Sequence, residues 1–139
     1  MLNTQTRYAI DPATAKTLDT DQLRDHFHVD GLFADGEIKL IYSHYDRLIL
    51  GSAVPGAGTL TLDKVAETGT ATFLERREMA VMNVGGTGTV TVGGESYTLE
   101  KGEVVYIGMG AGPVAFAGAG RFYILSAPAH RTCPTRLIK

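Results

Sequence analysis

The sequence predicts an all-β fold, a jelly-roll barrel preceded by a short helical segment, and three observations support this prediction. Short runs of β-branched, aromatic and aliphatic residues recur between residues 37 and 126, and Gly, Pro, Asn or Asp separates them. Gly93 and Gly94 lie between two alternating runs, where a two-residue hairpin turn needs positive φ at both central positions. Signals that begin a helix gather in the N-terminal quarter of the chain.

Two short helices are expected within residues 1–36. Asp11 and Pro12 offer an N-cap acceptor followed by a proline at the first helical position, which suits a short helix over residues 13–16. Asp19 has Gln22 three residues on, which is the spacing of a capping box that opens a second helix. Residues 1–36 are therefore interpreted as an N-terminal helical segment.

The strands follow from residue 37 onward and belong to a single domain, residues 1–139. A chain of this length can bury one core and is too short for two full ones. Residues 37–126 are predicted to form the barrel and residues 127–139 a C-terminal tail. The expected strands are Ile38–Tyr42, Leu48–Leu50, Thr59–Leu62, Met79–Val84, Thr89–Val92, Ser96–Leu99, Val104–Ile107, Val114–Phe116 and Phe122–Leu125.

Composition and charge argue against several classes of partner. The net charge is −2 and the Lys and Arg residues are scattered, so neither nucleic acid nor an anionic membrane is an expected partner. The sequence has no apolar run of membrane-spanning length, and residues 1–7 lack the apolar core of a secretory signal, which favours a cytoplasmic location. The single cysteine, Cys133, cannot form an internal disulfide and is interpreted as a spectator thiol.

Residues 71–85 match part of the first motif of metal-binding cupins. In that motif a His-x-His pair precedes a Glu, which six residues separate from a Gly; Glu78 and Gly85 keep this spacing. Because Gly86 follows Gly85, the motif can also be read one residue later, with Met79 at the carboxylate position. The His positions hold residues that cannot bind a cation, namely Thr72 and Leu74 in one spacing and Ala71 and Phe73 in the other.

The second cupin motif has lost its His as well. Gly102 begins a stretch with the motif's spacing, and Pro113 stands at the position of the third imidazole. A transition-metal site of this type needs about three protein ligands that converge on one ion. We therefore expect a cupin fold that binds no metal in this chain.

A first polar cluster at the end of an expected strand consists of His44, Asp46 and Arg47. One interpretation is a binding site that holds a carboxylate or a neighbouring subunit. The other is an Asp-Arg pair that stabilises a turn, since ion pairs are common on ordinary protein surfaces. A catalytic triad with Ser43 is not expected, because a strand would direct Ser43 to the opposite face from His44 and Asp46.

A charged tetrad directly precedes another expected strand and consists of Glu75, Arg76, Arg77 and Glu78. Alternation along a strand must direct part of this charge toward the interior, where a charge needs partners. In one interpretation Arg76 or Arg77 grips the carboxylate of a sugar inside a polar barrel pocket by its bidentate fork. In the other, the Arg and Glu side chains pair across strands or across a subunit contact.

Several of these runs together resemble one enzyme family. They are Ala15–Thr20, Tyr42–Ile49, Phe73–Glu78, Asn83–Gly86 and Ala127–His130. From about residue 13 to residue 135 the chain resembles the N-terminal half of the 5-keto-4-deoxyuronate isomerase family, the 4-deoxy-L-threo-5-hexosulose-uronate ketol-isomerases of pectin degradation. The resemblance implies a tandem cupin whose zinc ligands, three His and one Glu, lie in a C-terminal half beyond Lys139, and a cytoplasmic homo-oligomer, a hexamer in the family.

The resemblance leads to one main expectation and two alternatives. We expect a metal-free scaffold and assembly domain that partners the C-terminal cupin half, assembles into a homo-oligomer and is inactive alone; residues 127–139 would lead toward that missing half. The first alternative is an autonomous module that binds a uronate or similar acidic sugar through His44, Arg76 and Arg77. The second is an isomerase complete in this chain, with Glu78 or His44 as the proton shuttle, although it would lack the usual stabilisation of an enediolate.

Overall fold

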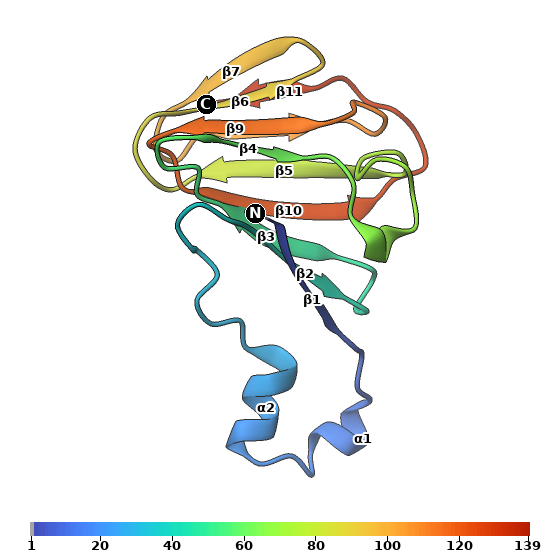
Figure 1. The fold of residues 1–139 in the computed structure, drawn as a ribbon. Helices are drawn as coiled ribbons and strands as arrows, with labels where there is room; N and C mark the ends of the chain where they lie inside the picture. The colour runs from blue at the N-terminus through green and yellow to red at the C-terminus, as the bar shows by residue number, and fades with distance from the viewer. Residues whose placement is uncertain (1) are drawn as a thin grey trace.

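Alternating burial along short strands builds two sheets that pack face to face in the computed structural model, which describes residues 2–139 (Figure 1). The seven-stranded sheet has the order β1 (Leu2–Arg7), β2 (Ile38–Ser43), β3 (Ile49–Ala53), β10 (Phe122–Pro128), β5 (Arg77–Asn83), β8 (Val104–Ile107) and β11 (Arg136–Ile138). The four-stranded sheet has the order β4 (Thr59–Leu62), β9 (Val114–Gly118), β6 (Gly88–Val92) and β7 (Glu95–Leu99). The predicted all-β jelly-roll class is confirmed, as a sandwich of two sheets that do not close into a continuous barrel.

Each strand expected from the sequence is present, and two further strands lie outside the predicted barrel. β1 pairs in parallel with β2, so that Leu2 lies opposite Ile38, and β11 pairs antiparallel with β8. Both occupy edges of the seven-stranded sheet. The segment interpreted as helical thus begins with a strand, and the predicted C-terminal tail ends in one.

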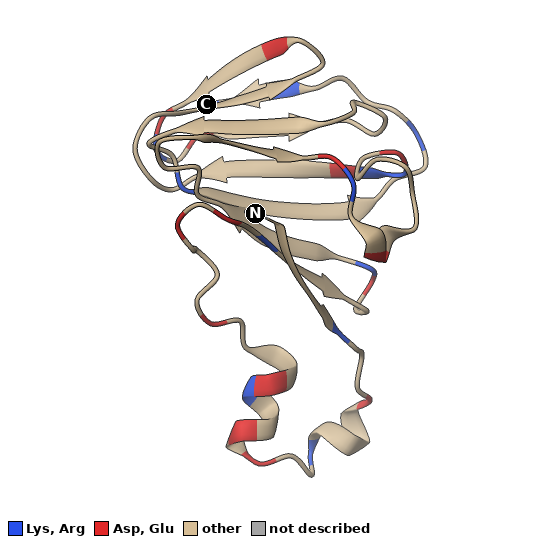
Figure 2. Cartoon of the chain, viewed as in Figure 1, with Lys and Arg blue, Asp and Glu red and all other residues tan. Residues whose placement is uncertain are grey.

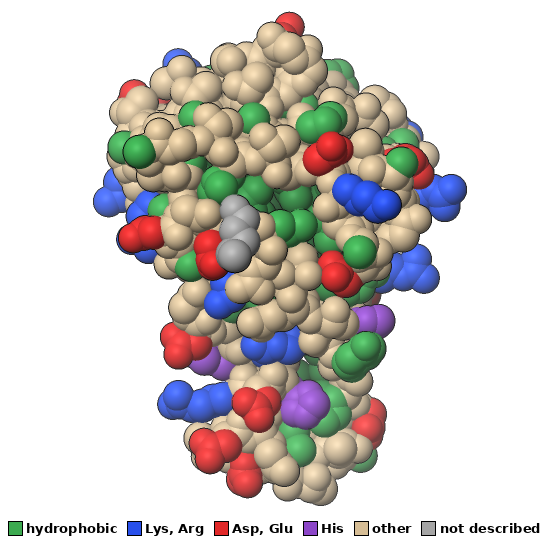
Figure 3. Space-filling model, in the orientation of Figure 1, with side chains coloured by type: hydrophobic (Ala, Val, Ile, Leu, Met, Phe, Trp, Pro, Cys, Tyr) green, Lys and Arg blue, Asp and Glu red, His purple; other side chains and the backbone are tan. Residues whose placement is uncertain are grey.

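The helical segment contains α1 (Pro12–Ala15) and α2 (Thr20–Phe27), and both capping predictions are confirmed. The Asp11 carboxylate accepts a hydrogen bond from the Thr14 backbone N–H at 3.1 Å. At α2, Asp19 and Gln22 form the reciprocal capping box, with bonds of 2.9 and 3.0 Å. Neither helix buries a side chain, and the segment projects from the sandwich as a separate lobe with acidic side chains exposed on it (Figure 3).

The space between the sheets is filled by apolar side chains from both of them. Phe116 of β9 and Phe122 of β10 meet there with ring centroids 5.4 Å apart, and both are fully buried. The predicted hairpin joins β6 to β7, with φ of +60° at Gly93 and +80° at Gly94. Charged residues lie mainly in loops, at strand ends and on the helical segment (Figure 2).

The outward side of the seven-stranded sheet carries a contiguous group of apolar and aromatic residues on four adjacent strands, which we term the outer apolar face. Ala80 of β5 lies opposite Leu125 of β10 and Tyr106 of β8. Leu125 is 43% exposed and Met82 is 40% exposed. The face comprises Ala80, Met82, Val104, Tyr106, Tyr123, Leu125 and Ile138.

Between residues 2 and 139, no helix combines the length and the apolar character that crossing a membrane requires.

Candidate functional site

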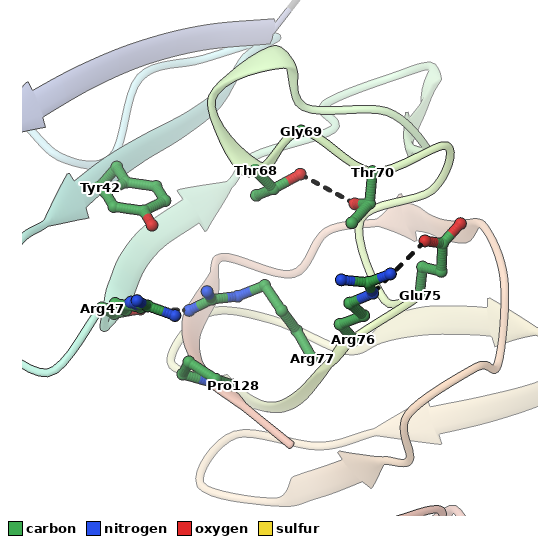
Figure 4. A pocket seen from close by; sticks show the side chains of 9 residues that line it. All are labelled: Tyr42, Arg47, Thr68, Gly69, Thr70, Glu75, Arg76, Arg77 and Pro128. Atoms are coloured by element: carbon green, nitrogen blue, oxygen red, sulfur yellow. Dashed lines mark hydrogen bonds and ion pairs between the residues drawn. The ribbon is translucent and has the colours of Figure 1, made fainter. Parts of the chain in front are cut away.

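A pocket of about 260 Å³ opens at one end of the sandwich, where two loops meet the beginning of β5 and the end of β10 (Figure 4). The short 3-10 helix η1 (Ala66–Thr68) and the loop after it form one wall, and the turn between β2 and β3 forms another. Its lining includes four of the residues predicted from the sequence. The full lining is Tyr42, Arg47, Thr68, Gly69, Thr70, Glu75, Arg76, Arg77 and Pro128.

Arg77 lies inside this end of the sandwich because inward and outward positions alternate along β5. Its side chain is 6% exposed and has the same orientation as the core residues Met79 and Val81. Its Nη2 donates to the carbonyl oxygens of Arg47, at 2.6 Å, and Ser126, at 3.0 Å. Its Nε donates to the Ser126 hydroxyl at 3.1 Å. These bonds hold the guanidinium between β10 and the β2–β3 turn.

Arg77 forms no ion pair with any carboxylate of the described residues, 2–139. The only ion pair among residues 2–139 joins Arg76 Nε to Glu75 at 3.9 Å, and both of those side chains are largely exposed. Burial lowers the pKa of Arg77 from its ordinary value, and the positive charge of Arg47 lowers it further. At neutral pH the pocket therefore contains a largely buried cation, whose contacts among residues 2–139 are carbonyl and hydroxyl oxygens and the faces of the Tyr42 and Phe73 rings.

The β2–β3 turn brings a second guanidinium to the first. Asp46 and Arg47 have φ of +55° and +54°, and the Leu48 N–H donates to the Tyr45 carbonyl at 3.2 Å, as a primed two-residue turn requires. A left-handed conformation costs a side chain such as Arg about 1–2 kcal/mol. In this conformation the Arg47 side chain points toward that of Arg77, beside Tyr42 (Figure 4).

The structure separates the cluster of His44, Asp46 and Arg47 that the sequence places together. Only Arg47 lines the pocket. His44 stacks on Tyr8 with ring centroids 4.7 Å apart, and Asp46 is exposed on the turn. β2 ends at Ser43, so the expected alternation through residue 46 is wrong. Within residues 2–139 Asp46 and Arg47 form no ion pair, and a primed turn replaces the proposed stabilising pair.

The charged tetrad is also divided, because Glu78 points to the outer side of the sheet. Its Oε2 accepts a hydrogen bond of 2.6 Å from the Tyr106 hydroxyl. Glu78 lines a second cavity, of about 290 Å³, together with Pro128, His130 and Cys133 among others. His44 lines neither cavity, so the structure does not bring together the two residues considered as proton shuttles.

The residues at the cupin ligand positions do not fit a zinc ion. Phe73 and Leu74 are buried in the core, and the inward position of β5 next to them belongs to Met79, in agreement with the later of the two motif spacings. Glu78 faces away from the interior, and Pro113 is exposed. In the described part of the chain, no three His, Cys, Asp or Glu residues come together as metal ligands.

Sequence reasoning missed several residues of the pocket. Thr68 and Thr70 come from a loop without a motif, and Tyr42 belongs to an expected strand that gave no sign of its role. Apolar side chains fill the interior of the sandwich, and the polar pocket that contains Arg76 and Arg77 lies at its end. The sequence feature that did indicate this pocket was the charged tetrad directly before β5.

Comparisons with known proteins agree on one family. The profile of the KduI/IolB family matches residues 27–139. The chain is 58% identical over 139 residues to the 4-deoxy-L-threo-5-hexosulose-uronate ketol-isomerase of Cereibacter sphaeroides (strain ATCC 17029), with 100% of this chain and 51% of that protein covered. It is 47% identical over 136 residues to the enzyme of the same name from Bacillus pumilus, with 95% and 50% covered. The chain thus spans about half the length of the curated relatives it matches.

Solved structures resemble the chain more distantly. The putative glyoxylate-induced protein from Pseudomonas aeruginosa aligns with a TM-score of 0.48 at 15% identity, covering 66% of this chain and 34% of that one. The Cnp3 cupin domain of Schizosaccharomyces pombe aligns with a TM-score of 0.45 at 14% identity, covering 66% and 63%. At this level of similarity the alignments carry no argument about function.

Proposed function

The chain belongs to the KduI/IolB family, and from this premise we propose that it is the N-terminal cupin half of a 4-deoxy-L-threo-5-hexosulose-uronate ketol-isomerase. In this proposal it acts as the scaffold and assembly half of an isomerase of pectin degradation. The ketol-isomerisation of the uronate, and the zinc site that supports it, belong to the other half. We further propose a cytoplasmic location and a symmetric homo-oligomer as the working form.

The outer apolar face is the observation that carries this proposal. Soluble proteins seldom leave a contiguous apolar patch on a sheet without a partner. Here Leu125 and Met82 are each about 40% exposed at the centre of a seven-stranded sheet, and Ile138 at its edge is 51% exposed. The relatives have about twice the length of this chain. We propose that the additional half of such a chain packs on this face.

The residues at the metal-ligand positions support the proposal that the other half of the protein carries the zinc site and the chemistry. In residues 2–139 the positions that hold metal ligands in a metal-binding cupin carry Phe73, Leu74, Met79 and Pro113, none of which suits zinc. Glu78 and His44 lie in different surroundings, so the two residues considered as proton shuttles do not face a common cavity. No catalytic residue is therefore proposed in this chain.

The test combines this chain with the half of the Cereibacter sphaeroides relative that lies beyond the matched residues. The two are coexpressed and analysed by size-exclusion chromatography with light scattering, and isomerisation of the 4-deoxy-5-keto uronate is followed with zinc present. We expect a stable complex between the halves and no turnover by this chain alone. Turnover by this chain alone would overturn the assignment of the chemistry to the other half.

A matched pair of variants locates the contact. Leu125→Glu introduces a charge at the centre of the outer apolar face and should weaken association with the second half by at least about tenfold, because the contact would bury an unpaired carboxylate. Thr98→Glu introduces the same charge at an exposed position of β7, on the other sheet, and should leave association unchanged. Equal association of both variants would contradict this docking surface.

A further inference from the structure

The pocket around Arg77 has donor groups that the fold does not use. Arg77 Nη1 has no hydrogen-bond partner within residues 2–139, while Nη2 and Nε are both bonded. Among the described residues, the one fully buried side-chain nitrogen or oxygen without a partner is Glu103 Oε2. Arg77 Nη1 is therefore open to the pocket, on a side chain that is otherwise buried.

The guanidinium of Arg47 also has hydrogen-bond donors that could bind a ligand in the pocket. It forms no hydrogen bond or ion pair within residues 2–139, although its backbone carbonyl receives the bond from Arg77. Two guanidiniums that point toward each other in a partly desolvated pocket repel one another unless an anion lies between them. The lining contains three Arg residues against the single carboxylate of Glu75, which leaves an excess of two positive charges.

The opposite wall offers acceptors. Thr70 donates its hydroxyl hydrogen to the Thr72 carbonyl at 2.6 Å, and Thr68 donates to the Val65 carbonyl at 2.8 Å, while the two hydroxyl oxygens lie 3.1 Å from each other (Figure 4). Each hydroxyl oxygen retains lone-pair capacity after donating its single hydrogen. The Tyr42 hydroxyl makes no hydrogen bond to any described residue and supplies a further donor or acceptor. This wall therefore suits the hydroxyl groups of a ligand.

We infer that this pocket is a binding site for a small hydroxylated carboxylate, such as a hexuronate. The ligand's carboxylate lies between Arg47 and Arg77, and its hydroxyls face Thr68, Thr70 and Tyr42. Carboxylate and guanidinium match in geometry and form two parallel charge-assisted hydrogen bonds. The left-handed backbone conformation of Arg47 fits this role, because it directs the second guanidinium into the pocket. This inference does not depend on the proposed scaffold role.

The experiment titrates the ¹⁵N-labelled chain with D-galacturonate, D-galactose, acetate and inorganic phosphate, followed by NMR. We expect D-galacturonate to shift the Gly69 amide and the Arg77 Nε–H signals, and to bind at least about tenfold more tightly than D-galactose or acetate. Stronger binding of phosphate than of D-galacturonate would overturn the carboxylate assignment. Equal binding of acetate and D-galacturonate would overturn the role of the hydroxyl-facing wall.

Two glycine variants distinguish the pocket from the turn. Arg47→Gly removes the guanidinium and suits the positive φ, so the variant should fold and lose about tenfold or more of its affinity for D-galacturonate. Asp46→Gly changes the backbone of the same turn at a residue that does not line the pocket, and should retain the affinity. Unchanged binding by Arg47→Gly, with the fold checked from its amide spectrum, would refute the inference.

Discussion

Arg77 and Glu78 are neighbours in sequence, yet their side chains lie on opposite faces of β5. Arg77 points inward to the Ser126 hydroxyl and to two carbonyl oxygens, whereas Glu78 points outward to Tyr106. The period of two along a strand separates them, and it was the reason to expect part of the tetrad inside. The sequence alone could not show which residues of the tetrad point inward, because the motif spacing allowed two registers for this strand.

At the residue scale, Tyr106→Phe tests the hydrogen bond on the outer side. That bond, followed by burial and the negative charge of Glu78, raises the pKa of Tyr106 above its ordinary value. Because the folded-state pKa is raised, the stabilisation is fully present below the unfolded-state pKa of about 10 and is lost as the pH rises through the folded-state value. Tyr106→Phe should lower the free energy of unfolding by at most about 1 kcal/mol near pH 7, since the pair is partly exposed.

Urea denaturation at pH 7 and at increasing pH above 10 measures this difference. Tyr123→Phe provides the control, because the Tyr123 hydroxyl makes no hydrogen bond within residues 2–139. A stability difference between the wild type and Tyr106→Phe that stayed constant through alkaline pH would contradict the assigned role of the hydrogen bond.

At the element scale, local chemistry decided which parts of the fold the sequence could reveal. Asp19 with Gln22 and the Gly93-Gly94 turn act through near neighbours, so their signals can be read directly. β1 gave no such signal, because its sequence is mostly polar and it is held by long-range pairing with β2. β11 has only three residues, too few to show a pattern.

The contribution of the capping box to the stability of α2 can be measured separately from that of the sandwich. Asp19→Ala removes the acceptor for the Gln22 N–H and should destabilise α2 by about 1 kcal/mol, which corresponds to roughly fivefold faster amide hydrogen exchange at residues 23–28. Asp21→Ala, in the same first turn, removes a charge without touching the box and should have a smaller effect. Since α2 buries no side chain, exchange in β5 and β10 should not change. Faster exchange in those strands would show that the helical segment unfolds together with the sandwich.

At the scale of the whole molecule, the pocket is assembled from segments that are far apart in sequence. Arg77 bonds to partners 30 and 49 residues away, and the threonines of the η1 loop face it from a third segment. Sequence reasoning identified Arg47, Arg76 and Arg77 as candidate binding residues. It could not show that Arg47 joins Arg77 while His44 does not, because the path of the β2–β3 turn decides this.

The attachment of β11 to the rest of the molecule depends on Gly108. A Cβ at this position would collide with the backbone carbonyl of Cys133, and the Gly108 N–H donates a hydrogen bond to the Thr135 hydroxyl oxygen at 3.3 Å. Gly108→Ala should displace residues 133–138, abolish the pairing of β11 with β8, and cost about 1–3 kcal/mol. Amide exchange at residues 136–138 and urea denaturation measure the two effects. Gly58→Ala, at a position with open space around it, should be close to neutral, and protected β11 amides in Gly108→Ala would disprove this account.

β1 also matters for how the protein is handled, since it covers the free edge of β2 along its whole length. Removing residues 2–7, or forcing them away with a bulky N-terminal fusion, would leave a row of unpaired backbone N–H and C=O groups beside buried Ile38 and Leu40. Such an edge is a template for another chain. Shortened forms of this protein should therefore self-associate through β2 and precipitate, even though every residue of the hydrophobic interior is still present.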